Sequence, residues 1–130
     1  MRQNDCVTQA IAYALKALDS DVPASLATLS DRIPDVPLAV AMIPPVAAYY
    51  GLYLTQVPVT LPLSILNNHE CYILCYRVPE GQHCVIMYRD SIYDPQRQHY
   101  VSLTRLTGNV TAIFHCQPAC SVETLFGLTN

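Results

Sequence analysis

The sequence predicts an α+β domain in which N-terminal helices pack on a C-terminal antiparallel sheet. Apolar residues recur at helical spacing over residues 6–18, and the composition changes after Gly51. Short runs of aromatic and β-branched residues, separated by turn residues, then follow one another. We therefore divide the 130 residues of a single compact domain into a helical half (about 1–51), a β half (about 52–120) and a short C-terminal tail (121–130).

The first predicted helix spans residues 6–18. Its apolar side chains recur at the i, i+3, i+4 spacing and form one face: Ala10, Ile11, Ala14, Leu15 and Leu18. Asn4 or Asp5 can cap the free N–H groups at its start. The helix therefore places Cys6 in its first turn.

Two further helical segments are predicted in this half. Residues 24–32 form a short helix between two prolines. Residues 38–50 are apolar and rich in alanine, and Pro44-Pro45 within them require a kink or a restart of the helix. Gly51 closes this segment.

Five segments of the second half have the composition of strands. They are rich in aromatic and β-branched residues, and turns such as Pro79-Glu80-Gly81 separate them. The predicted strands are residues 52–59, 71–77, 83–89, 91–93 and 110–116.

The composition excludes several classes of protein. Apolar residues make up 52% of the chain and charged residues 13%, which favours a globular domain over a disordered one. The net charge of −3 gives no basic field, so we expect no nucleic-acid partner. We also expect no membrane segment, because no apolar run approaches ~20 residues. The first residues lack the apolar core of a signal peptide, so we expect a cytoplasmic, reducing location.

The six cysteines allow either a disulfide framework or free thiols. Cys71, Cys75 and Cys84 lie inside apolar runs that resemble strands, where free cysteine is commonly buried. We therefore predict thiols and regard Cys116 and Cys120 as the pair to check for a disulfide.

Two patterns of histidine and cysteine resemble zinc ligands, but neither contains the Cys-x2-Cys knuckle of a structural zinc site. We therefore predict no metal and no cofactor. The two patterns are His69 with Cys71 and Cys75, and His115 with Cys116 and Cys120.

Cys6, His83 and Asp94 occur in the order that a cysteine nucleophile needs. A thiol attacks a carbonyl as thiolate, and free cysteine has a pKa near ~8.5. A helix N-terminus and a nearby imidazolium both lower that pKa. Cys6 has the helix, and His83 supplies the imidazolium if the sheet packs against this end of the helix. A carboxylate would then hold the imidazole in one tautomer.

The register of a hairpin selects Asp94 rather than Asp90 for this role. A two-residue turn at Arg89-Asp90 would place Val85 opposite Asp94, so that Asp94 shares a face with His83. Asp90 would lie at the hairpin tip, on the order of 20 Å away at ~3.3 Å per residue. A slip of one residue would move Asp94 to the other face of the sheet.

An oxyanion hole is the remaining part of such a site. The backbone N–H of Cys6 can donate to a developing oxyanion from the helix start. A side-chain amide just upstream would join it, and Gln3 and Asn4 are the candidates. We favour Gln3, because Asn4 is also a candidate helix cap.

These residues resemble the papain-like superfamily of cysteine peptidases over nearly the whole chain. The resemblance is greatest to the compact branch that contains bacteriocin-processing (double-glycine) peptidases and small cysteine-peptidase-like proteins of phages. Members of that branch begin with a helix like residues 5–11, Asp-Cys-Val-Thr-Gln-Ala-Ile. They continue to a strand led by histidine, like residues 83–88, and to an Asp-Pro pair like Asp94-Pro95.

The resemblance implies a papain-like fold and a cysteine protease that cleaves peptide bonds, as a viral or phage polyprotein or processing protease. It implies Cys6 as nucleophile, His83 as general base and acid, and Asp94 as the residue that orients the imidazole. A peptide or protein is the expected substrate.

Residues 5–11 are also similar to the ovarian-tumour (OTU) deubiquitinases, including those that cut polyproteins in plant viruses. Their motif has Asp-Cys, an apolar residue and then an alanine. Here Gln3-Asn4 stand where that family has Asp-Gly. This resemblance implies an alternative substrate, a ubiquitin-like C-terminus. A third interpretation is a binding module that keeps the fold after the chemistry has lapsed.

Overall fold

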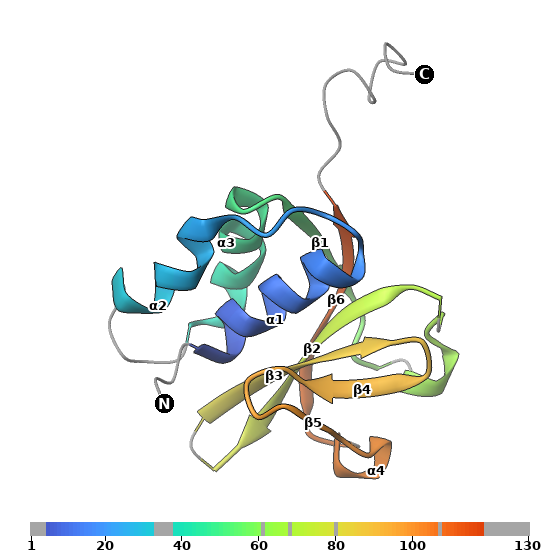
Figure 1. Ribbon diagram of the computed structural model, residues 1–130. Coiled ribbons are helices and arrows are strands. Elements are labelled where there is room, and N and C mark those ends of the chain that lie inside the picture. The colour runs from blue at the N-terminus through green and yellow to red at the C-terminus, as the bar shows by residue number, and fades with distance from the viewer. Residues whose placement is uncertain are drawn as a thin grey trace, which may run out of the picture.

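The structure is a computed structural model that describes residues 5–32, 38–60, 62–67, 69–79, 81–106 and 108–118. A six-stranded antiparallel sheet has the order β1-β6-β2-β3-β4-β5. Figure 1 shows helices α1, α2 and α3 gathered on one side of this sheet. The predicted α+β class and the antiparallel sheet are therefore confirmed.

The helical elements are α1 (Asp5–Ala17), α2 (Leu29–Arg32), α3 (Ile43–Tyr49) and α4 (Leu103–Leu106), with 3₁₀ turns at Ala24–Thr28, Val40–Met42 and Leu63–Ile65. The strands are β1 (Leu52–Val57), β2 (Cys71–Val78), β3 (Gly81–Tyr88), β4 (Ser91–Asp94), β5 (His99–Tyr100) and β6 (Val110–Pro118).

Local sequence signals account for most of these boundaries. Pro44 and Pro45 occupy the first turn of α3, where a missing N–H costs no hydrogen bond, so the helix restarts there as expected. Gly51 follows α3 with a φ of +93°, a conformation that glycine adopts without strain. β1 ends at Val57, two residues earlier than predicted. The sequence did not predict β5 or α4, because elements of two and four residues carry no readable periodicity.

The two faces of the sheet bury two separate apolar clusters. Ile73 and Cys75 pack with α1 and α3, whereas Tyr72 and Leu74 pack on the opposite face with α4. Side chains alternate between faces along a strand, so both faces of β2 are covered. This strand therefore lies in the centre of the fold, next to β3.

The first cluster fixes the position of α1. Its apolar face, which includes Ala10, Ile11 and Ala14, is fully buried against the sheet. Tyr13 stacks on Tyr93 of β4, with ring centroids 5.1 Å apart. These contacts hold the N-terminus of α1 beside β3 (Figure 1). In the described part of the chain, no helix is long and apolar enough to cross a membrane.

Candidate active site

The hairpin of β3 and β4 brings His83 and Asp94 together. Arg89 and Asp90 have φ values of +52° and +65°, as in the two-residue turns that match the twist of a hairpin. Tyr88 pairs with Ser91 and Ile86 with Tyr93. The register expected from the sequence is therefore confirmed, and Asp94 lies on the same face as His83.

The imidazole of His83 is held by a buried carboxylate. His83 Nε2 lies 2.7 Å from Asp94 Oδ2, and Asp94 has no exposed surface. The other carboxylate oxygen, Oδ1, accepts a hydrogen bond of 3.0 Å from the backbone N–H of Arg97. With both of its oxygens engaged, Asp94 fixes the ring of His83 so that Nδ1 is free to face another group.

Cys6 is that other group, and it hydrogen-bonds to the His83 side chain. Cys6 also hydrogen-bonds to the thiol and to the backbone of Cys84, the next residue of β3. Because β4 ends at Asp94, residues 81–84 of β3 extend beyond it. We infer that Cys6 lies at this uncovered stretch of β3, since neighbouring side chains of one strand point to opposite faces.

The surroundings of Cys6 favour its thiolate. The hydrogen bond from the Cys84 thiol is the largest influence, and the hydrogen bond and charge of His83 act in the same direction. Burial opposes them, yet the pKa of Cys6 falls from 9.0 to about 5. The positive end of α1 also favours a negative charge in its first turn. At neutral pH Cys6 is therefore ionised.

The same contacts favour the protonated form of His83. Burial lowers the pKa of this imidazole, but the hydrogen bonds to Cys6 and Asp94 and the two negative charges outweigh that effect. The pKa of His83 is thus raised above 6.5. These contacts therefore favour a thiolate–imidazolium pair of Cys6 and His83, with Asp94 hydrogen-bonded to the other ring nitrogen. This arrangement can deliver a nucleophile and a proton to the same carbonyl compound.

Tyr76 closes the site on the side of β2. It lies opposite His83 in the sheet, and the two rings meet edge to face with centroids 5.6 Å apart. Burial raises the pKa of Tyr76, and the charge of Asp94 adds to this effect. Tyr76 therefore shields the imidazole from water and stays neutral.

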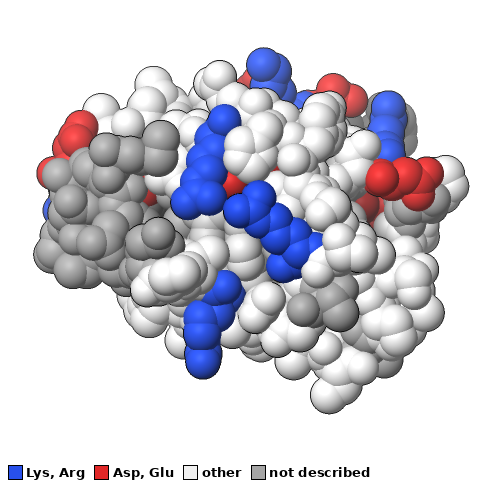
Figure 2. All heavy atoms as spheres, turned by 90° about the horizontal axis from the view of Figure 1, so that it is seen from below, with Lys and Arg blue, Asp and Glu red and all other residues white. Residues whose placement is uncertain are grey.

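Exposed positive charges lie near this ring. The charges of Arg97 and Arg105 both oppose the rise in the pKa of Tyr76. Figure 2 shows several Lys and Arg side chains close together on the face seen from below, the side on which α4 and β5 lie in Figure 1. The site thus has positive potential on one flank.

Cys84 and Tyr76 are the participants that the sequence did not single out. Alternation along β3 places Cys84 on the face opposite to His83, and Cys84 therefore looked like a buried strand thiol. The one sequence feature that could have indicated a role for Cys84 is its position next to His83. Gln3 and Asn4, the expected oxyanion donors, lie outside the described residues.

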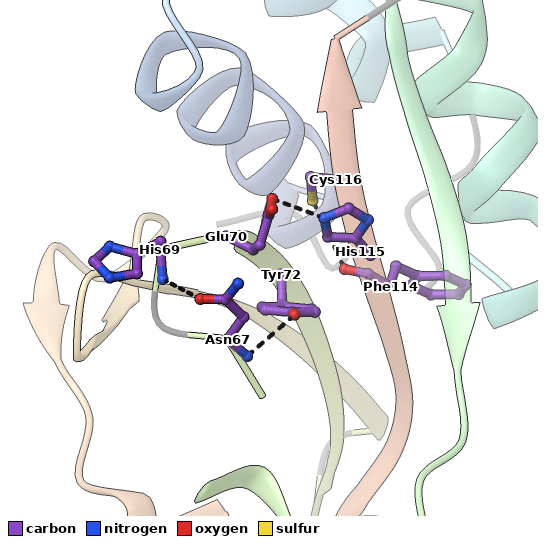
Figure 3. A network of polar contacts seen from close by, with 7 residues as sticks. All are labelled: Asn67, His69, Glu70, Tyr72, Phe114, His115 and Cys116. Carbon is purple, nitrogen blue, oxygen red and sulfur yellow. Dashed lines mark hydrogen bonds and ion pairs between the residues drawn. The ribbon is translucent and has the colours of Figure 1, made fainter. Parts of the chain in front are cut away.

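The other histidine and cysteine patterns do not converge on a metal. No group of three or more His, Cys, Asp and Glu side chains could hold an ion within the described ranges. His115 instead pairs with Glu70 at 2.9 Å and lies against Tyr72, as Figure 3 shows. None of the five cysteines that the structure describes forms a disulfide, and Cys120 lies outside the described residues.

A surface pocket lies away from Cys6, His83 and Asp94. It has a volume of about 540 Å³ and lies at the opposite end of α1, lined by Tyr13, Lys16 and Tyr93 among others. None of Cys6, His83 and Asp94 lines it.

No model of a known protein family matches the chain, and no curated protein or solved structure is significantly similar to it.

Proposed function

We propose that the protein is a cysteine peptidase with a papain-like fold and that Cys6, His83 and Asp94 are its catalytic residues. The observation that carries this proposal is the contact of the Cys6 thiolate, at the N-terminus of a buried helix, with an imidazole held by Asp94 at 2.7 Å. Neither the helix nor the histidine alone would distinguish a nucleophile from a structural thiol.

The reaction follows from the protonation states of the pair. Cys6 Sγ attacks the carbonyl carbon of the scissile peptide bond, and the backbone N–H of Cys6 donates to the developing oxyanion. The His83 imidazolium protonates the leaving amine, so that the C–N bond breaks and a thioester remains on Cys6. Neutral His83 then takes a proton from water, which attacks the thioester and releases the acid.

Asp94 supports both halves of this cycle. Because it holds Nε2, the proton that moves to and from the substrate is the one on Nδ1. Its charge also stabilises the imidazolium that precedes amine release. Asp94 therefore acts through His83, by positioning its ring and by placing a charge beside it.

Burial of the site favours a substrate with small residues next to the scissile bond. Cys6 and His83 are each only 4% exposed, so a bulky side chain beside the reacting carbonyl would have little room. A processing substrate ending in Gly-Gly, or the Gly-Gly terminus of ubiquitin, would fit such an approach. A deubiquitinase is therefore the second candidate, and it uses the same three residues.

A pH series of alkylation tests the nucleophile first. Cys6 should react with iodoacetamide well below pH 8, with peptide mapping to identify the labelled thiol, and His83→Ala should abolish this reactivity. A ubiquitin with a C-terminal electrophile and peptides with Gly-Gly or Leu-Leu before the scissile bond then test the substrate. If Cys6 reacts only near pH 8.5 in both proteins, the peptidase proposal fails and a binding module is the better interpretation.

A further inference from the structure

Three buried thiols form a continuous series from the site into the core. Cys6 hydrogen-bonds to Cys84, and Cys84 Sγ lies 3.5 Å from Cys75 Sγ. Cys75 and Cys84 face each other directly across β2 and β3. Cys84 is therefore in contact with both of the other sulfur atoms. In peptide cleavage only the sulfur of Cys6 forms a bond to the substrate. The Cys84 thiol serves there as a hydrogen-bond donor to Cys6, and Cys75 has no part in that reaction.

We propose that Cys6, Cys84 and Cys75 form a hydroperoxide-sensitive redox site, in which oxidised Cys6 is captured by Cys84 as a disulfide. This site depends on the reactivity of Cys6 and not on peptide cleavage. A small hydroperoxide needs less room than a peptide, which matches the 4% exposure of Cys6.

The first step is attack of the Cys6 thiolate on one oxygen of the hydroperoxide. An S–O bond forms, the O–O bond breaks, and the alcohol or water leaves with the proton of the His83 imidazolium. Sulfur is oxidised by two electrons and the peroxide is reduced by two. Cys6 becomes a neutral sulfenic acid.

The second step is attack of the Cys84 sulfur on the sulfur of Cys6. An S–S bond forms, the S–O bond breaks, and hydroxide leaves as water with the proton of the Cys84 thiol. Before oxidation the hydrogen bond to Cys6 is the largest influence that raises the pKa of Cys84, followed by that to Cys75 and by burial. Formation of a neutral sulfenic acid at Cys6 removes the largest of these effects, so Cys84 becomes a better nucleophile once Cys6 is oxidised.

Cys75 provides a third step by thiol–disulfide exchange. Its sulfur attacks Cys84, which gives a Cys75–Cys84 disulfide across the two strands and returns Cys6 as a thiol with the proton of Cys75. The oxidising equivalents thus move from the site to a buried pair. A small dithiol restores the reduced state.

The chain contains a matched control for this proposal. Cys71 and Cys116 also face each other across neighbouring strands, are buried and hydrogen-bond to each other. Cys71 is four residues from Cys75 along β2, about 13 Å at ~3.3 Å per residue. This pair has the same strand geometry without the nucleophile, so we expect it to stay reduced.

To test this, the reduced full chain is treated with hydrogen peroxide at pH 7 and the reaction is quenched with acid. The protein is then alkylated in denaturant, and its peptides are mapped without reduction. We expect a disulfide that contains Cys84 and a mass loss of two hydrogens, reversed by dithiothreitol. Cys71 and Cys116 should be alkylated. In Cys84→Ser, Cys6 should proceed to sulfinic and sulfonic acid, which dithiothreitol does not reverse. Cys71→Ser should behave as the wild type.

Two results would overturn the proposal. One is oxidation of the Cys71–Cys116 pair at the same rate as Cys84, and the other is equal formation of sulfinic acid in wild type and Cys84→Ser. If Cys84→Ser does not fold, peptide mapping of the wild type and of Cys75→Ser still tests the proposal. In Cys75→Ser the oxidation should end at the Cys6–Cys84 disulfide, because the third thiol is missing. These readouts require no peptide cleavage. A chain that forms the disulfide without peptidase activity would separate this proposal from the proposed function.

Discussion

His83 Nε2 and Asp94 Oδ2 lie 2.7 Å apart although eleven positions separate them in the chain. A two-residue turn and an unbroken register between β3 and β4 produce this contact. Since it occupies Nε2, it leaves Nδ1 of the imidazole for Cys6. Much of the chemistry expected of this protein depends on that assignment of the two ring nitrogens.

Cys6→Ser and His83→Ala should each lower kcat/KM on a cleaved Gly-Gly peptide by roughly 10³-fold or more, because each removes one member of the reacting pair. Cys116→Ser is the matched control, since Cys116 is buried in the same core but does not contact Cys6 in the described site. It should keep activity close to that of the wild type. Equal losses in Cys116→Ser and Cys6→Ser would point to a general folding defect.

The pH dependence of Cys6 alkylation should report the groups that lower its pKa. In the wild type the midpoint should lie near pH 5. Cys84→Ala and His83→Ala should both move it upward, toward 9.0, because each removes a hydrogen bond to the thiolate. Stopped-flow absorbance at the thiolate band, with Cys6→Ser as the blank, measures the midpoint. A midpoint unchanged in both variants would contradict the assigned contacts.

Asp94→Asn should reduce activity less than the loss of Cys6 does, by about 10- to 10²-fold, since the general acid and base is still present. The charge of Asp94 helps to raise the pKa of His83, so its removal should shift the alkaline limb of the rate profile to lower pH. A lower maximum rate with the alkaline limb at the same pH would mean that Asp94 acts through packing. Asp94→Ala should also lower the free energy of unfolding by about 1–3 kcal/mol, because it leaves a buried donor without a partner.

Stability should rise with pH between about 5 and 6.5 and then level off. In this window Cys6 is ionised only in the folded state, because its pKa falls from 9.0 to about 5 on folding, whereas His83 is protonated in both states. The unfolded chain therefore binds one proton more, and the free energy of unfolding increases by up to about 2 kcal/mol.

Above pH 6.5 the unfolded state loses the proton of its histidine while folded His83 keeps it. The extra proton on Cys6 in the unfolded state is then balanced by the extra proton on His83 in the folded state, so stability no longer changes with pH. The stability contributed by His83 is lost across this range, and the loss is complete once the pH exceeds the raised folded pKa of His83. Urea unfolding at several pH values tests this, with Cys6→Ser as the reference. The difference in the free energy of unfolding between the wild type and Cys6→Ser, plotted against pH, should show this rise and plateau. A difference that does not change with pH would contradict the prediction.

Acidic side chains near the scissile bond should improve cleavage. The charges of Arg97 and Arg105 act on Tyr76, whose ring contacts His83, so the positive potential reaches the site. The double variant Arg97→Gln/Arg105→Gln should lower kcat/KM a few-fold for an acidic peptide and leave a neutral peptide unchanged. Because both arginines are exposed, the preference should weaken in salt. Equal losses on both peptides would assign the arginines a structural role.

The sequence was sufficient for the features that depend on near neighbours. The spacing of Ala10 and Ala14 predicted α1, and with it the place of Cys6 in a first helical turn. The two positions between Tyr88 and Ser91 predicted the turn and, through the period of two along a strand, the pairing of His83 with Asp94. Each of these follows from backbone geometry over a few residues, which any chain with this pattern shares.

Only the tertiary structure decided the features that depend on distant segments. β6 lies between β1 and β2, a position that no local pattern specifies because its partners are distant in the chain, from 34 positions (Tyr76 with Val110) to 66 positions (Leu52 with Pro118). The contact of Cys6 with Cys84 likewise requires α1 to lie across the stretch of β3 that β4 leaves uncovered. Packing of the whole apolar face of α1 sets that position, so the sequence determined which groups could react, and the fold determined which of them meet.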